Sequence, residues 1–170
     1  GIDDNSFNQT AWQGVLNEQE ELGIEGRFLA SQAETDYEAN LNSLIGEQCD
    51  IIFTIGFLLG DATRTAAEAN PEQLFSIVDF AYDPPLDNVL GQVYATDEAA
   101  FLAGYLSAGM TETGILGVFG GINIPPVTIF MDGFAWGVDH YNEVHGTDVT
   151  VLGWDTDTRE GLFTNKFYED

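Results

Sequence analysis

Hydrophobic positions along the chain change from helical spacing to short unbroken runs, and this alternation predicts helices and strands in turn. The first helix is predicted to begin at Ser6, because Ser6 and Gln9 have the spacing of a capping box. Its apolar face contains Trp12, Val15, Leu16 and Leu22. Thr35 and Glu38 predict a second capping box, ahead of another helix.

Short apolar runs predict the strands, at residues 26–30, 50–55, 74–78, 89–95, 115–119 and 148–152. Helices are predicted at residues 59–69, 97–110 and 125–144. The first of these stops at Asn70-Pro71, and Pro125-Pro126 suits the start of the last. The run at 50–55 is dominated by Ile51, Ile52, Phe53 and Ile55, as in strands inside a parallel sheet. The pattern predicts an α/β fold with mostly parallel strands and helices on both faces.

The loops that follow the predicted strands share a composition that is small, acidic or aromatic. They contain Ser31, Gly56-Phe57, Asp79-Phe80, residues 120–123 and Gly153-Trp154-Asp155. In open parallel sheets, ligands bind beyond the carboxyl ends of the strands. The composition of these loops therefore favours a binding cleft.

An acidic loop also leads into the first predicted helix. Phe7 and Asn8 fall in its first turn, where free backbone N–H groups point outward and the helix dipole is positive. A flat apolar ring beside amide and carboxylate groups, including Asp4, suits a flat, polar, uncharged ligand. The alternative is that Phe7 is a hydrophobic staple and that Asp3 and Asp4 only solvate the loop.

The net charge of −25, from 29 acidic residues against 4 basic ones, excludes whole classes of partner. Nucleic-acid binding depends on cations that neutralise phosphates, and docking to anionic lipid depends on a basic face. Neither is expected here. An acidic surface fits an extracytoplasmic or salt-adapted protein, and the ligand is expected to be neutral or cationic.

Catalytic and metal-binding patterns are weak. His140 and His145 lie near the end of a predicted helix, where histidine usually serves the dipole. Cys49 is the single cysteine, so neither a disulfide nor a cysteine metal site is expected. Asp3 with Asp4, or Asp155 with Asp157, could bind calcium. One alternative function is therefore a calcium-dependent nucleoside or sugar hydrolase that uses clustered Asp residues. A second alternative is a ligand-sensing effector domain of the same fold. No cofactor is expected.

Four aromatic residues fall at or near the predicted ligand edge: Phe7, Phe57, Phe130 and Trp154. Ordinary core packing is the preferred interpretation for Phe130. A base stacked on such a ring gains roughly 1–3 kcal/mol. Nearby acids would accept hydrogen bonds from sugar hydroxyls, so the set predicts a nucleoside or sugar pocket without covalent chemistry.

Several motifs, in order along the chain, resemble the BMP family of basic membrane lipoproteins, the PnrA-like substrate-binding proteins of ABC transporters. The opening is residues 4–14 (DNSFNQTAWQG), followed by residues 36–41 (DYEANL) and 55–59 (IGFLL). Residues 101–106 (FLAGYL) and 120–134 (GGINIPPVTIFMDGF) come next. Residues 153–155 (GWD) and 161–164 (GLFT) resemble one branch of the family.

The resemblance implies a type I periplasmic-binding fold, with two lobes, a hinge and a purine nucleoside in the cleft. By motif, the ligand-binding residues would be Asp4, Phe7, Asn8, Gly56, Phe57, Asp79 and Trp154, with Trp154 as the aromatic that faces Phe7. Partners would be an ABC transporter permease and the membrane, the latter through a lipid anchor outside this chain. The location would be periplasmic or at the cell surface.

Two departures from the family pattern indicate a fragment of a longer protein. The strand that usually precedes the Asp4 loop is absent, and about half of the second lobe is missing after Asp170. The predicted division places lobe 1 at residues 1–110 and a partial lobe 2 at residues 111–170.

Overall fold

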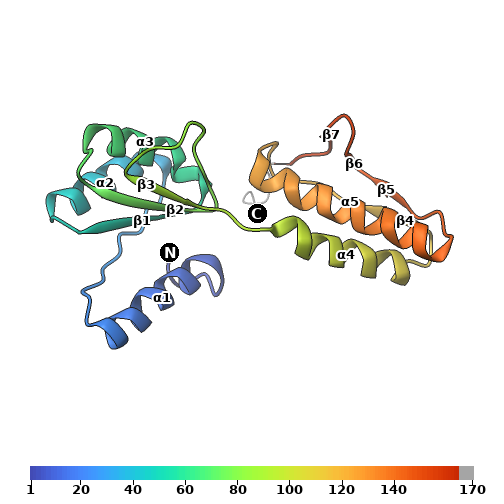
Figure 1. Ribbon diagram of the computed structural model, residues 1–170, viewed down its shortest axis with the longest axis horizontal. Coiled ribbons are helices and arrows are strands. Elements are labelled where there is room, and N and C mark those ends of the chain that lie inside the picture. Colours follow the sequence, from blue (N-terminus) through green and yellow to red (C-terminus); the bar gives the residue numbers. More distant parts are fainter. Residues whose placement is uncertain (165–170) are drawn as a thin grey trace. The chain divides into compact units, whose positions relative to one another are not determined.

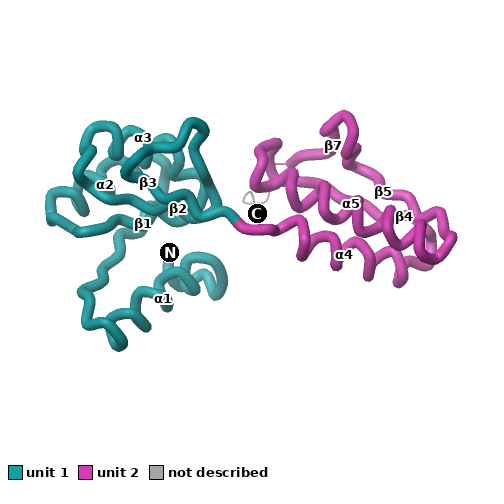
Figure 2. The backbone as a smooth tube through the Cα atoms, viewed as in Figure 1, with its two compact units in different colours: residues 1–93 teal, residues 94–170 magenta. Residues whose placement is uncertain are grey.

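A computed structural model describes residues 1–164 and divides the chain into two compact units, residues 1–93 and 94–170 (Figure 2). Each unit has helices and a parallel sheet of its own (Figure 1). The predicted α/β class with mostly parallel strands is confirmed. Residues 97–110, which the sequence assigned to lobe 1, form a helix of the second unit. The division of the whole protein into lobes at residue 110 stays a prediction.

The first unit contains α1 (Phe7–Leu22), η1 (Glu34–Asp36), α2 (Tyr37–Gly46), β1 (Ile51–Ile55), η2 (Phe57–Leu59), α3 (Gly60–Ala69), β2 (Leu74–Val78) and β3 (Val89–Gln92). Its sheet has the order β1-β2-β3, and both strand pairs are parallel. Ile55 pairs with Val78, so the loops after β1 and β2 leave the sheet at the same edge.

Helices α2 and α3 pack on one face of this sheet. The core comprises Leu41 from α2, Ala66 and Ala67 from α3, and Ile52 and Phe75 from the strands. The Thr63 hydroxyl donates to the buried Thr54 hydroxyl at 3.0 Å, which satisfies both polar groups inside the core. On the opposite face, Ile51, Phe53, Leu74 and Leu90 are exposed among the described residues.

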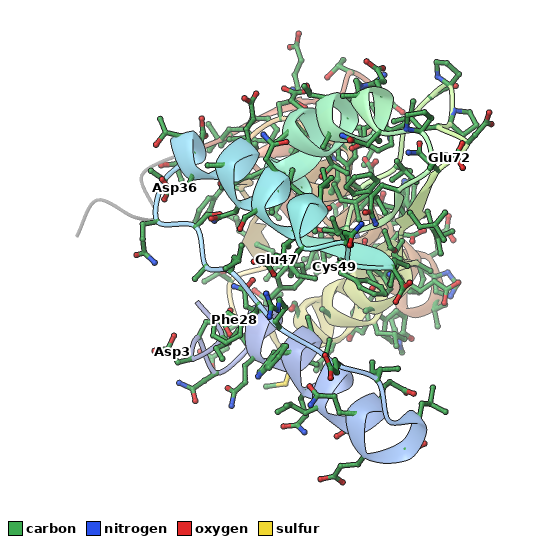
Figure 3. All side chains as sticks on the ribbon, turned by 90° about the vertical axis from the view of Figure 1, so that its left-hand side faces the viewer. Asp3, Phe28, Asp36, Glu47, Cys49 and Glu72 are labelled. Carbon is green, nitrogen blue, oxygen red and sulfur yellow. The ribbon has the colours of Figure 1, made fainter. Side chains whose placement is uncertain are left out.

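The strand predicted at residues 26–30 does not form. This segment packs on α1 instead: the Phe28 and Trp12 rings meet edge to face at 5.1 Å, and Phe28 lies beside the helix in Figure 3. Gly26 approaches Val15 and Gln19 of the same helix. A strand is stabilised by a backbone ladder, and no described strand lies alongside this segment. The apolar residues of this segment are therefore packed, as expected, but the prediction of a strand is wrong.

Both predicted capping boxes are also wrong. Ser6 is the N-cap of α1, but its side chain makes no capping hydrogen bond. Helix α2 begins at Tyr37 after a short 3₁₀ turn. There the Asp36 carboxylate accepts from the backbone N–H of Gln32 at 2.8 Å and of Ala33 at 3.1 Å. At α1 the Asp4 carboxylate accepts from the N–H of Ser6 and Gln9, the two groups that the box would have used, whereas at α2 the Asp36 carboxylate caps a turn that begins earlier in the chain.

The second unit contains α4 (Thr96–Met110), β4 (Ile115–Gly117), α5 (Pro125–His145), β5 (Thr150–Leu152), β6 (Trp154–Asp155) and β7 (Glu160–Gly161). Strands β4 and β5 are parallel, whereas β6 and β7 form a short antiparallel pair. Helices α4 and α5 and strands β4 and β5 agree with the predicted elements to within a few residues, whereas β6 and β7 were not predicted.

Helices α4 and α5 approach so closely that their backbones touch. A Cβ atom at Gly104 would collide with the Phe134 carbonyl oxygen, and one at Gly137 would collide with the Phe101 carbonyl oxygen. Only glycine permits this separation. The pair holds α5 in place, and α5 in turn forms a small core with the loop after β5, through Met131, Ala135 and Trp154.

Candidate functional site

Asp4 organises the start of α1. Its Oδ1 accepts from the backbone N–H of Ser6 and of Gln9, both at 3.0 Å. Its Oδ2 accepts from the backbone N–H of Asn8 at 2.9 Å and from the Asn8 side chain at 2.8 Å. One carboxylate thus satisfies three of the free donors at the helix N-terminus.

These hydrogen bonds fix the charge state of Asp4. Donation by the backbone N–H of Asn8, then of Gln9 and Ser6, holds the pKa of the Asp4 carboxyl well below its usual range. A carboxylate has about four acceptor positions, and four donors already occupy those of Asp4. The structure therefore gives Asp4 a role in shaping the loop and orienting Asn8. Direct contact of Asp4 with a ligand stays a prediction.

Phe7 and Gly56 bring together the acidic loop before α1 and the loop after β1. The Phe7 side chain is 44% exposed. A Cβ atom at Gly56 would lie 3.6 Å from Phe7 Cε1, so the edge of the ring lies close to the backbone at this point. Gly56 has a φ of +102°, a conformation that suits glycine. Phe57, at the start of η2, is half-buried beside it.

Asp79 follows β2 at the edge of the sheet where Gly56 follows β1. The Gly56 N–H donates to the Val78 carbonyl at 3.2 Å, and the Asp79 N–H donates to the Gln92 carbonyl at 2.8 Å. Burial raises the pKa of the half-buried Asp79 carboxyl. Its carboxylate accepts no hydrogen bond from any residue that the structure describes. Asp79, unlike Asp4, therefore has acceptor positions to offer.

Trp154 lies in the second unit and is only 6% exposed. Its ring packs edge to face on Phe163 at 5.9 Å and belongs to the core formed with Met131 and Ala135. Its Nε1–H donates to Asp132 Oδ1 at 3.0 Å. The indole is thus a core side chain with a satisfied polar atom. A ligand-stacking role for Trp154 stays a prediction, and it would require the ring to leave this packing.

Asp132 and Arg159 were not predicted from the sequence. Asp132 is 2% exposed, and its Oδ2 accepts from the Arg159 guanidinium at 2.7 Å. The Arg159 side chain is 65% exposed. Two sequence signals could have revealed this pair: an acid among the buried residues of an apolar helix, and one of only four basic residues beyond a strand end.

The arrangement does not favour the calcium-dependent hydrolase. Residues 1–164 contain no group of three His, Cys, Asp or Glu side chains that could hold a metal ion. Asp155 Oδ1 instead accepts from the backbone N–H of Asp157 at 2.9 Å and of Thr158 at 2.8 Å, closing a turn. His145 Nε2 lies 3.0 Å from the Tyr105 hydroxyl in the α4–α5 pair, away from the strand-end loops.

No helix within the described part of the chain is both long and apolar enough to cross a bilayer.

Comparisons with known proteins match the chain over nearly its whole length. The family model described as "ABC transporter substrate-binding protein PnrA-like" matches residues 1–169. The "ABC transporter nucleoside-binding protein BmpA" of Lactococcus lactis is 33% identical over 165 residues, covering 95% of this chain and 47% of the relative. "Basic membrane protein A" of Borreliella burgdorferi is 33% identical, covering 99% of this chain and 50% of the relative.

Among solved structures, the chain resembles an ABC transporter solute-binding protein from Aeropyrum pernix. The TM-score is 0.76 at 30% sequence identity, over 89% of this chain and 43% of that one. The chain spans about half the length of the curated relatives that it matches. The family match covers the strand-end loops of both units. The chain therefore belongs to the PnrA-like family of ABC transporter substrate-binding proteins.

Proposed function

We propose that this chain forms ligand-binding surface in an extracytoplasmic solute-binding protein whose ligand is a purine nucleoside. One observation supports the proposal above others. An exposed aromatic ring, Phe7, lies beside Gly56, and Asp79, whose carboxylate accepts no hydrogen bond from residues 1–164, follows β2 at the same edge of the sheet. The name of the Lactococcus lactis relative states that it binds nucleosides, which agrees with this chemistry.

Each group has a physical role in the proposal. The Phe7 ring offers a stacking surface for a purine base, worth roughly 1–3 kcal/mol. The Asp79 carboxylate accepts hydrogen bonds from ribose hydroxyls, and a charged acceptor makes these bonds stronger than neutral ones. Asp4 holds the loop that presents Phe7 and Asn8. Nothing in this scheme breaks a bond in the ligand, so the proposal is binding and release without chemistry.

The proposed partners follow from the family. A permease of an ABC transporter would receive the ligand, and a lipid anchor outside this chain would attach the protein to the membrane. The net charge of −25 is consistent with an extracytoplasmic surface and with a ligand that carries no phosphate. Nucleic acid is not a proposed partner.

The direct test is titration of the full-length protein with adenosine, guanosine and inosine by calorimetry. We expect a dissociation constant at or below the micromolar range, about −8 kcal/mol or tighter. Nucleoside should be recovered intact after incubation with and without calcium. Release of free base would support the hydrolase, and the absence of heat with every purine nucleoside would reject nucleoside binding.

Phe7→Ala tests the stacking surface. Affinity should fall about tenfold or more, because the base loses a ring contact of this size. Phe28→Ala is a matched control, since Phe28 is 45% exposed but packs on Trp12. Equal affinities for Phe7→Ala and the unmodified protein would remove Phe7 from the site.

A further inference from the structure

The loop after β5, which includes the short strand β6 and the turn to β7, is held to α5 by one buried carboxylate. Asp132 accepts from two donors of this loop, the Trp154 indole at 3.0 Å and the Arg159 guanidinium at 2.7 Å. The two donors use different oxygens of the carboxylate. Trp154 is thereby fixed inside the core, while Arg159 is fixed with most of its side chain in solvent.

Arg159 lies beyond the carboxyl end of β5. Strands β4 and β5 are parallel, with Gly117 paired to Leu152, so the loops after both strands leave the sheet at one edge. A parallel bridge between Gly120 and Phe163 continues the pairing past that edge. In open α/β sheets this is the edge where ligands bind. An exposed guanidinium here is placed for ligand contact within the second unit alone.

The chemistry of Arg159 restricts what it can recognise. A guanidinium has five N–H donors and no acceptor, and among residues 1–164 only Asp132 takes a hydrogen bond from it. Its outward donors face solvent, because the side chain is 65% exposed, and they can exchange water for an acceptor on a ligand. Since the Asp132 charge balances that of Arg159, the pair as a whole suits a neutral acceptor such as a carbonyl oxygen.

We propose that Arg159 donates hydrogen bonds to the O6 and N7 acceptors of a 6-oxopurine nucleoside, and that Asp132 is the residue that positions its guanidinium. This inference rests on the proposed function and adds a specificity to it. A guanidinium fork matches the O6/N7 edge of guanine, whereas adenine places a donor, N6–H₂, at the same point. Inosine and guanosine should therefore bind more tightly than adenosine.

The measurement is the ratio of the adenosine Kd to the inosine Kd for the full-length protein. We expect a ratio of about ten or more, equivalent to ~1.4 kcal/mol. Arg159→Gln should reverse the preference toward adenosine, because a glutamine amide matches the adenine N6/N7 edge. Arg159→Ala should bring the ratio close to one. Arg27→Gln is the matched control: it removes an exposed arginine that pairs with Glu47 in the first unit, and the ratio should not change.

Asp132→Asn tests the positioning role. Asparagine keeps an acceptor for the Trp154 indole but loses the charge that holds Arg159. The ratio should fall toward one, while tryptophan emission stays close to that of the unmodified protein. If this buried substitution unfolds the protein, the surface variants of Arg159 decide the question alone.

The outcomes separate the two proposals. If no purine nucleoside binds the unmodified protein, the proposed function fails and this inference fails with it. If nucleosides bind but the ratio is close to one, or is the same in Arg159→Gln, only the specificity is overturned. A reversed preference in Arg159→Gln supports it.

Discussion

Replacing Asp79 by asparagine separates ligand binding from folding at this position. Asp79 sits at a φ of +64°, a left-handed conformation that asparagine tolerates better than most residues. Its carboxylate accepts no hydrogen bond from the described residues, so the change breaks no side-chain hydrogen bond within them. Any loss of affinity in Asp79→Asn would then reflect contact with the ligand.

The size and sign of both effects follow from the structure. Asparagine keeps one acceptor oxygen but loses the charge and the second oxygen, so one charged hydrogen bond to a ribose hydroxyl is lost. Such a bond contributes about 1.5–3 kcal/mol, which corresponds to a roughly 10- to 150-fold weaker Kd. The stability of the unliganded protein should instead increase in this variant. Burial raises the pKa of Asp79 in the folded protein, so folding loses stability as the pH rises from the unfolded pKa through the folded one.

At neutral pH the unliganded Asp79→Asn variant should therefore unfold at a slightly higher temperature than the unmodified protein. Calorimetric titration and thermal unfolding of the same samples measure the two effects. Asp50→Asn is the control, because Asp50 is exposed at the amino end of β1, the opposite edge of the same sheet. Unchanged affinity would exclude Asp79 from the site, and a loss of stability would show that its charge supports the fold.

The remaining predictions concern stability. Gly137→Ala should destabilise the protein by about 3 kcal/mol in denaturant unfolding, because the new Cβ meets the Phe101 backbone, which cannot move aside. Gly14→Ala, in an α1 position with no atom near the new Cβ, should instead stabilise by ~0.5–1 kcal/mol, and a similar loss in both variants would contradict the packing argument. Asp4→Asn should speed hydrogen exchange at the Asn8 amide. In the unmodified protein the stability from Asp4 is present above its unfolded pKa and is lost as the pH falls toward its lowered folded value. The protection factor of the Asn8 amide, its exchange rate relative to that of an unstructured peptide at the same pH, should therefore fall between neutral pH and pH 3, and an unchanged protection factor would argue against the cap.

The sequence by itself determined the element types and the sheet direction over most of the chain. Apolar runs as short as residues 74–78 are typical of strands in a sheet, and helices between such runs favour parallel neighbours. Residues that end parallel strands meet at one edge whatever their side chains are. For that reason Gly56 and Asp79 could be placed together before any coordinates were known.

Only the tertiary structure decided which individual groups face solvent and which are already satisfied. Residues 26–30 have strand-like composition, but a strand forms only when a neighbouring strand supplies backbone hydrogen bonds. This segment packs its side chains on α1 instead. Asp4 and Trp154 fit the pattern of ligand residues equally well from sequence. In the structure, the Asp4 carboxylate accepts hydrogen bonds from the first turn of α1 and from the Asn8 side chain. Trp154 is held in the core by Asp132, 22 residues away in sequence. Contacts between residues distant in sequence set the outcomes for residues 26–30 and Trp154, and local patterns do not contain them. The hydrogen bonds of Asp4 are local, but they depend on the exact backbone path into α1, which residue types alone do not specify.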